Sequence, residues 1–408
     1  MNHTKVHVLY LTRNGLLEPL GQSQVMNYLR ELSKDHVINL ITYEKKKDLN
    51  NKLAMSRAKA DCDAHGIRWL PQLFQPRNNI ISQFLSILRM FWIVQREVRL
   101  RRISLIHARS YIPASVALVV NRIMGTPFIF DMRALWPEEL ISSGRIRRGS
   151  LTHRVIVRAE RACLIKSDAV VSLTKAAVEY LKAIYPTELK NQNIVVIPTC
   201  ADIHRFTPSI IKRSDHIVHG CIGTVISGWF LIEWLATWIQ VAALRDPNAI
   251  FKIVTRDKSK TIREIIDPEK KLTKRLSIVS ELSENMPNVI QRHDLSVMFF
   301  TKGLSKLGSA PTRLAEALGC GLPVVVNEGV GDVAEIVKNN NVGVIVKGNS
   351  QVQMEEALNE LIILMKDPEL SNRCRSLAKN KFSLQVGTDA YSKIYSTIIK
   401  SKDISCAA

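Results

Sequence analysis

"SAPTRLAEALGCGLPVVVNEGVGDVAEIV", residues 309–337, decides the fold class of this 408-residue chain. The pattern predicts a short turn, an amphipathic helix over 311–318, a glycine turn at 319–323, an apolar strand, and a glycine-rich loop that opens another helix. One glutamate, Glu316, stands on the apolar-patterned helix, and a buried carboxylate is costly unless a partner accepts it. We therefore expect Glu316 to have a specific partner.

The same alternation of apolar strands and helices extends over the whole chain. Strands rich in Val, Ile and Leu, separated by helices, are typical of a parallel sheet that helices cover on both faces. We expect strands at 6–12, 37–43, 104–110, 127–133, 169–174 and 193–198 in the first half, and at 217–224, 250–255, 276–280, 295–300, 322–327 and 342–346 in the second. The fold class is therefore α/β, with two Rossmann-like doubly wound domains that face each other across a cleft.

Composition limits the class of protein. The hydrophobic fraction of 46% and the charged fraction of 23% are ordinary for a globular protein, and no apolar run reaches the ~18 residues of a membrane span. The N-terminal stretch lacks the features of a signal peptide and reads as the first strand. Seven scattered cysteines without a CxxC pair predict reduced thiols, a cytoplasmic location and no zinc site. The Asp-x-Asp sequence at 61–63 follows a helical stretch, so we expect no metal there either.

The net charge of +20 is concentrated in one part of the chain. Residues 75–165 contain fifteen arginines, no lysine and five acidic residues, a net charge of +10. Such a surface favours polyanions, although it also suits a solvated face that only aids solubility. No recognised nucleic-acid motif accompanies the charge, so we expect no nucleic acid partner.

The segment 80–102 combines apolar and basic residues on one predicted helix. Its apolar positions 81, 84, 85, 88, 91 and 92 share a helical face, and its arginines gather toward the C-terminal end. Two interpretations remain open: a core helix with a solvated last turn, or an interfacial helix on anionic lipid. "GRIRRG" at 144–149 adds three arginines in a predicted loop. We hypothesise peripheral attachment of the 77–161 region to the inner face of a membrane.

The opening stretch also predicts a ligand site. Pro311 suits the first turn of the helix and Ser309 suits its cap. The N-terminus of this helix follows a strand end, where free N–H groups and the helix dipole favour an anion. About one turn further on, Glu316 can accept two adjacent hydroxyls of a ribose, as acidic residues do in dinucleotide sites. A local salt bridge with Arg313 is the alternative explanation.

"PTRLAEALGCGLPVV" followed by "GVGDVAEIV" resembles the donor-binding segment of the GT-B glycosyltransferases of family 4. Other segments agree with it in the right order. These are "EPLGQSQVMNYLREL" (18–32), "FIFDMRALWPEE" (128–139), "VVSLTKAAVEYL" (170–181), "VIPTCADIHRFTP" (196–208) and "FSLQVGTDAYSKIY" (382–395). The resemblance implies an N-terminal acceptor domain at 1–202 and a C-terminal donor domain at 203–385. It also implies a C-terminal helix, 386–400, that packs back on the first domain.

The resemblance assigns residues of the second domain to the donor. Glu316 matches the second glutamate of the family's glutamate–seven–glutamate motif and would bind the ribose. The implied contacts to the donor phosphates come from Gly223, Thr224, Ser309 and Thr312 of this domain, and from Gly21 in a loop of the first domain. Two features depart from the family. Gly308 stands where the first glutamate belongs, and the Arg and Lys that follow the first glycine are absent. Among Lys302, Lys306 and Arg313, we expect Arg313 to neutralise the diphosphate instead.

The resemblance also points to the strand ends of the first domain. His107 matches the first of two histidines that some members carry, while Arg109 replaces the second and cannot act as a base. We expect His107, Asp131 and Arg133 to be catalytic, and Arg109, Glu138 and Glu139 to bind the acceptor. The alternatives without a functional role are a structural histidine and an internal Asp–Arg pair that braces a loop.

The resulting functional prediction is a hexosyltransferase-type enzyme. It would move a sugar from a nucleoside diphosphate sugar to a glycan or lipid-linked acceptor in surface polysaccharide synthesis, with retention and without metal or cofactor. The alternatives are a non-catalytic GT-B scaffold that binds sugar or polyanion, and a nucleotide-sugar epimerase. The sequence leaves open the donor base, the sugar, the acceptor and the linkage.

Overall fold

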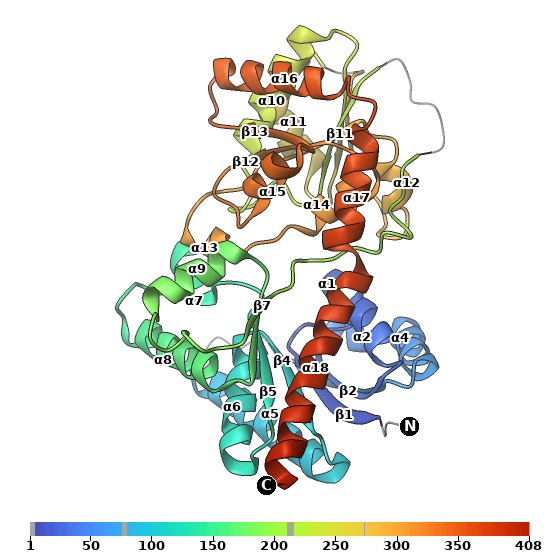
Figure 1. Ribbon diagram of the computed structural model, residues 1–408. Helices are drawn as coiled ribbons and strands as arrows, with labels where there is room; N and C mark the ends of the chain where they lie inside the picture. The colour runs from blue at the N-terminus through green and yellow to red at the C-terminus, as the bar shows by residue number, and fades with distance from the viewer. Residues whose placement is uncertain (1–4, 76–79, 210–215, 273, 408) are drawn as a thin grey trace. The chain divides into compact units, whose positions relative to one another are not determined.

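A computed structural model describes residues 5–75, 80–209, 216–272 and 274–407. The chain divides into two compact units, each built around one sheet (Figure 1). Unit 1 contains the chain up to Ile197 and the segment from Gly387 onward, and unit 2 contains Pro198–Val386. The linker residues 198–202, which we placed in the first domain, therefore belong to unit 2.

Unit 1 is built on a seven-stranded parallel sheet with the order β3-β2-β1-β4-β5-β6-β7. The strands are β1 (Val6–Thr12), β2 (His36–Lys45), β3 (Arg68–Phe74), β4 (Leu105–Arg109), β5 (Phe128–Asp131), β6 (Ala169–Ser172) and β7 (Ile194–Val196). The sequence reading missed β3, which contains Pro71 and has no fully buried residue. An edge strand tolerates proline because one side of it has no ladder partner.

Helices of unit 1 connect these strands. They are α1 (Pro19–Gly21), the π-helical turn η1 (Gln22–Met26), α2 (Asn27–Leu32), α3 (Lys46–Leu49), α4 (Lys52–Ala64), α5 (Ile80–Arg101), α6 (Tyr111–Met124), α7 (Trp136–Ser142), α8 (Leu151–Lys166) and α9 (Lys175–Ile184). The last helix, α18 (Leu384–Ala407), crosses the sheet of unit 1. Residues 61–63 lie inside α4, where Asp61 pairs with Arg30.

Unit 2 has a six-stranded parallel sheet with the order β10-β9-β8-β11-β12-β13. The strands are β8 (Val218–Ile222), β9 (Ile250–Val254), β10 (Leu276–Val279), β11 (Leu295–Met298), β12 (Val324–Asn327) and β13 (Gly343–Val346). The helices are α10 (Ile232–Arg245), α11 (Ser259–Ile266), α12 (Met286–Ile290), α13 (Leu304–Leu307), α14 (Thr312–Gly319), α15 (Val333–Asn340), α16 (Gln351–Leu364) and α17 (Leu370–Phe382). The predicted fold class, α/β with two Rossmann-like domains, is confirmed.

Alternate residues of the unit 2 strands pack into two separate hydrophobic cores. Along β12, Val325 joins a cluster with Trp238 and Phe251, while Val324 and Val326 join another with helix α14. Successive side chains of a strand point to opposite faces, so each face of the sheet is covered by its own apolar layer. This two-sided burial explains why the strands read as continuous apolar runs.

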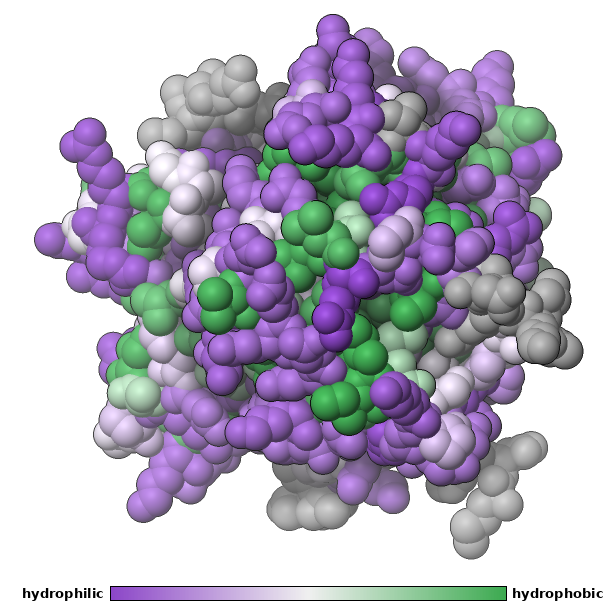
Figure 2. Space-filling model, turned by 90° about the horizontal axis from the view of Figure 1, so that it is seen from above, coloured by the Kyte–Doolittle hydropathy of each residue, from purple (hydrophilic) through white to green (hydrophobic). Residues whose placement is uncertain are grey.

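The surface is mostly hydrophilic on the face shown in Figure 2, where hydrophobic side chains lie in small patches. Helix α5 differs from this pattern. Its buried face is formed by Met90, Val94 and Val98, whereas Phe84 is 63% exposed and Trp92 is 59% exposed. The apolar face that the sequence pattern identified is thus the outer one. Among the described residues, no helix is long and apolar enough to cross a membrane.

Glu160 on α8 is an unpaired acid in the interior of unit 1. Its side chain is 6% exposed, and its Oε2 accepts a hydrogen bond from the Tyr111 hydroxyl at 2.7 Å. Burial raises its pKa to about 7, since desolvation outweighs this hydrogen bond. The folded state therefore holds a proton that the unfolded state loses near pH 4.5.

This proton makes stability fall as the pH rises. The folded pKa lies above the unfolded one, so the free energy of unfolding should fall by up to about 3 kcal/mol between pH 4.5 and 7. Glu160→Gln should remove this dependence, and the exposed control Glu179→Gln should keep it. Urea unfolding across that pH range is the measurement. Parallel pH profiles for the wild type and Glu160→Gln would contradict the assignment.

Candidate functional site

The strand order of unit 2 places a topological switch point between β8 and β11. Ligands of open α/β sheets bind outside the carboxyl ends of the strands at such a point. Gly223 follows β8, and Phe299–Thr301 follow β11. Residues 230 and 300 join these two segments through an isolated bridge, and the Leu231 N–H donates to the carbonyl of Phe299 at 3.0 Å.

Gly223 makes room for an arginine. Its φ of +97° is unfavourable for other residues, and a Cβ built on it would lie 2.3 Å from Nη2 of Arg313. The guanidinium of Arg313 therefore rests directly against the backbone of the turn after β8. Any side chain at position 223 would displace it.

Arg313 on α14 lies beside two aromatic rings and forms no ion pair in the described chain. Its Cζ is 6.0 Å from the Phe230 ring centroid and 5.2 Å from that of Phe300. Its Nη1 is buried without a hydrogen-bond partner, and burial lowers the pKa of the guanidinium. A buried cation without a partner is unfavourable. The arrangement thus presents unsatisfied donors at the switch point of the sheet.

Glu316 lies one turn further along α14. Burial raises its pKa to about 7, against the opposing effect of the Arg313 and Arg205 charges. Within the described residues, its carboxylate forms neither a hydrogen bond nor an ion pair, so the local salt bridge with Arg313 is absent. The partner that the sequence led us to expect is therefore not a protein group of the described chain.

Other predicted donor-binding residues surround this pair. Lys306 is 5% exposed, with its Nζ 2.7 Å from the centroid of the Trp229 ring, and the Nζ of Lys302 is 5.8 Å from that of Trp234. Thr224 is exposed in the turn after β8. Of the three predicted cations, Lys302, Lys306 and Arg313, it is Arg313 that contacts Gly223.

The start of α14 differs from the expectation. Ser309 does not cap the helix, because α14 begins at Thr312 and its N-cap residue is Pro311, with no side-chain cap. Gly308, which replaces the motif glutamate, is buried at the end of α13.

Sequence reasoning also missed a residue that shapes the turn after β8. Asp257 accepts hydrogen bonds from the N–H groups of Val225 at 2.7 Å and Ile226 at 2.9 Å. It follows β9, the neighbouring strand, so only the strand order could have revealed this contact.

In unit 1, the three predicted catalytic residues form a buried network with helix α18. Nδ1 of His107 lies 2.6 Å from the Tyr395 hydroxyl, and Nε2 lies 3.4 Å from Oδ2 of Asp131. Tyr391 also donates to that Oδ2, at 3.2 Å, and Arg133 contacts the other carboxylate oxygen at 3.6 Å. His107 and Asp131 are each 1% exposed. Both nitrogens of His107 are thus engaged by protein groups.

Charge within this network is balanced internally. Burial lowers the pKa of His107 despite the adjacent Asp131. Burial also opposes ionisation of Asp131, but the charges of Arg133 and His107 outweigh it and hold the pKa of that carboxyl below its usual value. The network therefore favours a neutral histidine beside an ionised aspartate, and it fixes α18 against the ends of β4 and β5.

The predicted acceptor-binding residues are engaged within the protein. Arg109 is buried and donates to Oδ1 of Asn14 at 3.0 Å. Glu138 pairs with Arg148 and accepts from the Tyr180 hydroxyl at 3.2 Å, while Glu139 lies next to it on α7.

Gly21 packs tightly inside unit 1. A Cβ there would lie 2.1 Å from the carbonyl oxygen of Gly15. The close backbone approach at this glycine is therefore made to the loop after β1.

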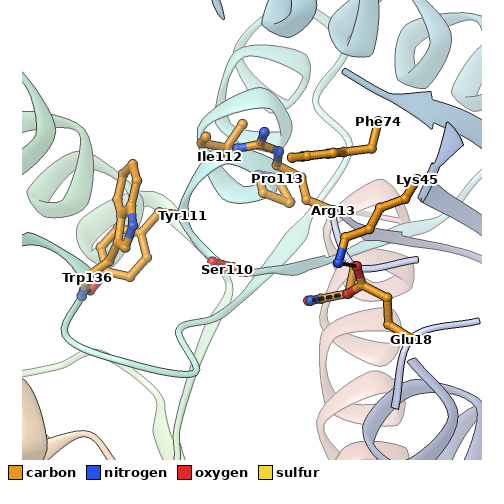
Figure 3. A pocket seen from close by; sticks show the side chains of 10 residues that line it. Arg13, Glu18, Lys45, Phe74, Ser110, Tyr111, Ile112, Pro113 and Trp136 are labelled. Atoms are coloured by element: carbon orange, nitrogen blue, oxygen red, sulfur yellow. Dashed lines mark hydrogen bonds and ion pairs between the residues drawn. The ribbon is translucent and has the colours of Figure 1, made fainter. Parts of the chain in front are cut away.

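Sequence reasoning missed a pocket in unit 1. It has a volume of about 310 Å³ and lies at the carboxyl ends of β1 and β4, the switch point of the first sheet. Figure 3 shows Arg13, Trp136 and the Glu18–Lys45 pair around it, with Ser110 between them. These residues come from five separate segments, which no local motif could have combined.

Among the described residues, no group of three or more His, Cys, Asp or Glu side chains could hold a metal ion.

Comparison with known proteins extends over both units. Residues 21–200 match the model of the glycosyl transferase 4-like domain, and residues 236–381 match that of glycosyl transferases group 1. No curated protein matches the chain by sequence.

Solved structures share the fold at low sequence identity. A glycosyltransferase from Rickettsia africae ESF-5 has a TM-score of 0.73 and 15% identity, with 98% of this chain and 100% of that one covered. Anabaena Alr3699/HepE in complex with UDP and glucose has a TM-score of 0.67 and 15% identity, with 95% and 99% covered. WaaG, a glycosyltransferase involved in lipopolysaccharide biosynthesis, has a TM-score of 0.63 and 13% identity, with 95% and 99% covered.

The two matched models lie in the expected order, one in each unit, and the neighbours share both sheets. The chain belongs to the family 4 glycosyltransferases of the GT-B fold.

Proposed function

We propose that this protein transfers a sugar from a nucleoside diphosphate sugar to a glycan or lipid-linked acceptor. One observation carries the proposal. Arg313, whose Nη1 is buried, and the half-buried carboxylate of Glu316 form no ion pair or side-chain hydrogen bond in the described chain, and they lie one helical turn apart at the switch point of unit 2. A nucleoside diphosphate offers both complementary groups, because its phosphates are anionic and its ribose carries two hydroxyl donors.

Each residue then has a defined task. The carboxylate of Glu316 accepts the two ribose hydroxyls, and the guanidinium of Arg313 binds the diphosphate. The absence of a side chain at Gly223 lets that guanidinium lie against the turn after β8, and we propose Thr224, Ser309 and Thr312 as further donors to the phosphates. Arg313 thereby stabilises the negative charge that develops on the leaving group, which is the main electrostatic requirement of the reaction.

We propose a retaining reaction that needs neither metal nor cofactor. The bond between the sugar and the diphosphate oxygen breaks, the acceptor oxygen forms the new bond on the same face, and the acceptor proton passes to the leaving diphosphate. The contacts of His107 support this route, because both ring nitrogens already bind Tyr395 and Asp131. Within this proposal, His107, Asp131 and Arg133 act as positioning residues that fix α18.

Two alternatives to sugar transfer remain distinguishable. A non-catalytic scaffold is favoured by the missing motif glutamate at Gly308, and an unpaired arginine would serve anion binding in it as well, so turnover of a nucleotide sugar separates it from a transferase. An epimerase would use the same donor site, so product analysis with a panel of nucleotide sugars separates it from a transferase.

We further propose that α5 attaches the protein to an anionic membrane surface, as expected for a cytoplasmic enzyme of surface polysaccharide synthesis. Phe84, Leu85, Leu88 and Trp92 form an exposed apolar face, and Arg89 and Arg96 flank it around a shallow pocket of about 420 Å³. Contiguous exposed apolar side chains next to cations are typical of interfacial helices.

Glu316→Gln tests the ribose contact. Loss of a charged acceptor should weaken UDP, GDP or ADP binding by about tenfold to a hundredfold, because each such hydrogen bond contributes about 1.5–3 kcal/mol. The wild-type affinity should also fall as the pH drops through 7, where Glu316 becomes protonated, and the affinity of the variant should not. Calorimetric titration measures both, with the exposed Glu335→Gln on α15 as the control. Unchanged affinity in Glu316→Gln would refute the ribose assignment.

Arg313→Met tests the diphosphate contact. Methionine fills much of the same space without charge, so kcat should fall by about a hundredfold to a thousandfold. The melting temperature should not fall, because the substitution removes a buried unpaired cation. Arg292→Met, an exposed change in the same unit, should leave both quantities unaltered. Normal turnover in Arg313→Met would show that another group neutralises the leaving group.

Vesicle flotation tests the role of α5. The wild type should float with anionic vesicles at low salt and be released as salt rises, since each basic residue near the surface adds about 1 kcal/mol. Trp92→Glu should abolish flotation, while Leu244→Glu, at an even more exposed apolar position on α10, should not. A protein that never floats at low salt, or two variants that behave alike, would exclude attachment through this helix.

A further inference from the structure

The pocket of unit 1 contains a cation that nothing in the described chain neutralises. Arg13 follows β1 and forms no hydrogen bond or ion pair there. Its guanidinium lies over the Phe74 ring at 5.4 Å, and burial lowers its pKa. Arginine nevertheless stays protonated in proteins, so the pocket keeps a half-buried positive charge.

The acids nearby are already occupied. Glu18 pairs with Lys45 at 2.7 Å, which neutralises both of these pocket residues. Glu44 is fully buried, and its carboxylate accepts from the Leu16 N–H at 2.7 Å and the Thr42 hydroxyl at 2.6 Å. The charge of Arg13 is therefore the net charge of the pocket.

The backbone at the pocket adds to this positive potential. Helix α6 starts at Tyr111, and its N-cap residue, Ser110, makes no side-chain cap. Ser110 has a φ of +78°, which is a strained conformation for serine. Ser110 and Tyr111 both line the pocket. The positive end of the α6 dipole and its first N–H groups thus lie at the same cavity as Arg13.

Aromatic side chains give the pocket a second kind of surface. The rings of Tyr111 and Trp136 lie 5.5 Å apart and line one side, whereas Arg13 and Phe74 line another (Figure 3). An aromatic face packs against the apolar face of a sugar ring, and the volume of about 310 Å³ is at the small end for ligand pockets.

We propose that this pocket binds a sugar that carries an oxyanion, a phosphate or a carboxylate, with Arg13 on the anion and Trp136 on the ring. The proposal rests on the transferase function above and names the class of its acceptor. The anion supplies the counter-ion that the guanidinium of Arg13 lacks, and the sugar ring packs against the aromatic side of the cavity. Neutral sugars would leave Arg13 without a counter-ion and bind weakly.

The test uses the full chain and small probes. Calorimetric titration or saturation-transfer NMR compares glucose 1-phosphate, glucuronate and glucose. We expect at least one anionic probe to bind at least tenfold more tightly than glucose. Arg13→Met should remove this preference, Arg13→Lys should restore part of it, and the exposed Lys47→Met should keep it. The two anionic probes decide between phosphate and carboxylate.

A second variant separates the ring contact from the charge. Trp136→Ala should weaken binding of the favoured sugar anion but leave binding of inorganic phosphate or acetate unchanged. Equal binding of glucose and both anionic sugars, or an unaltered preference in a folded Arg13→Met, would overturn the proposal. Binding of UDP, GDP and ADP, read by thermal shift in the same samples, tests the donor site independently. If none of the three nucleotides shifts the melting temperature of the wild type, the transferase function is refuted and the anion site is not.

Discussion

The structure of unit 2 is organised around one desolvated guanidinium. Arg313 lies against the backbone of Gly223 and beside the rings of Phe230 and Phe300, and its Nη1 is buried without a hydrogen-bond partner. The fold of the described chain gives this charge no counter-ion, and in the proposed function the diphosphate supplies one. The glycine after β8, an aromatic residue after β11 and the first turn of α14 meet at this guanidinium.

Unit 1 treats its buried charges in the opposite way. Asp131 is surrounded by Arg133, His107 and Tyr391, so the network is satisfied before any ligand arrives. Removing one partner from such a network leaves a buried charge without compensation. This destabilises the fold more than replacing the whole network by apolar side chains would. The two units thus treat charged groups differently: Asp131 and its neighbours fix a C-terminal helix, whereas Arg313 and Arg13 have no protein counter-ion in the described chain and are the residues that we propose to bind ligands.

The sequence predicted the parts of the fold that depend on local pattern. Twelve of the strands were recognisable as apolar runs, because helices bury both faces of each sheet. The edge strand β3 was not, since its residues are only partly buried and include Pro71. For the site, the resemblance led us to predict Arg313 because the Arg and Lys that usually follow the first glycine of the second domain are absent here. The sequence did not identify Arg13 as a site residue, because its pocket is formed by five segments that are distant in the chain. No motif or spacing in the sequence indicates that these segments come together.

The arginine-rich region shows why net charge alone does not define a surface. Its arginines occur in different environments. Arg109 and Arg133 lie inside the protein. Arg148 forms an ion pair with Glu138, and Arg161 forms one with Glu188. Charges that are buried or paired contribute little to an external potential. What remains distinctive is α5, where Arg89 and Arg96 stand beside exposed apolar side chains. The case for a membrane surface therefore depends on this combination on one helix, and not on the total of fifteen arginines.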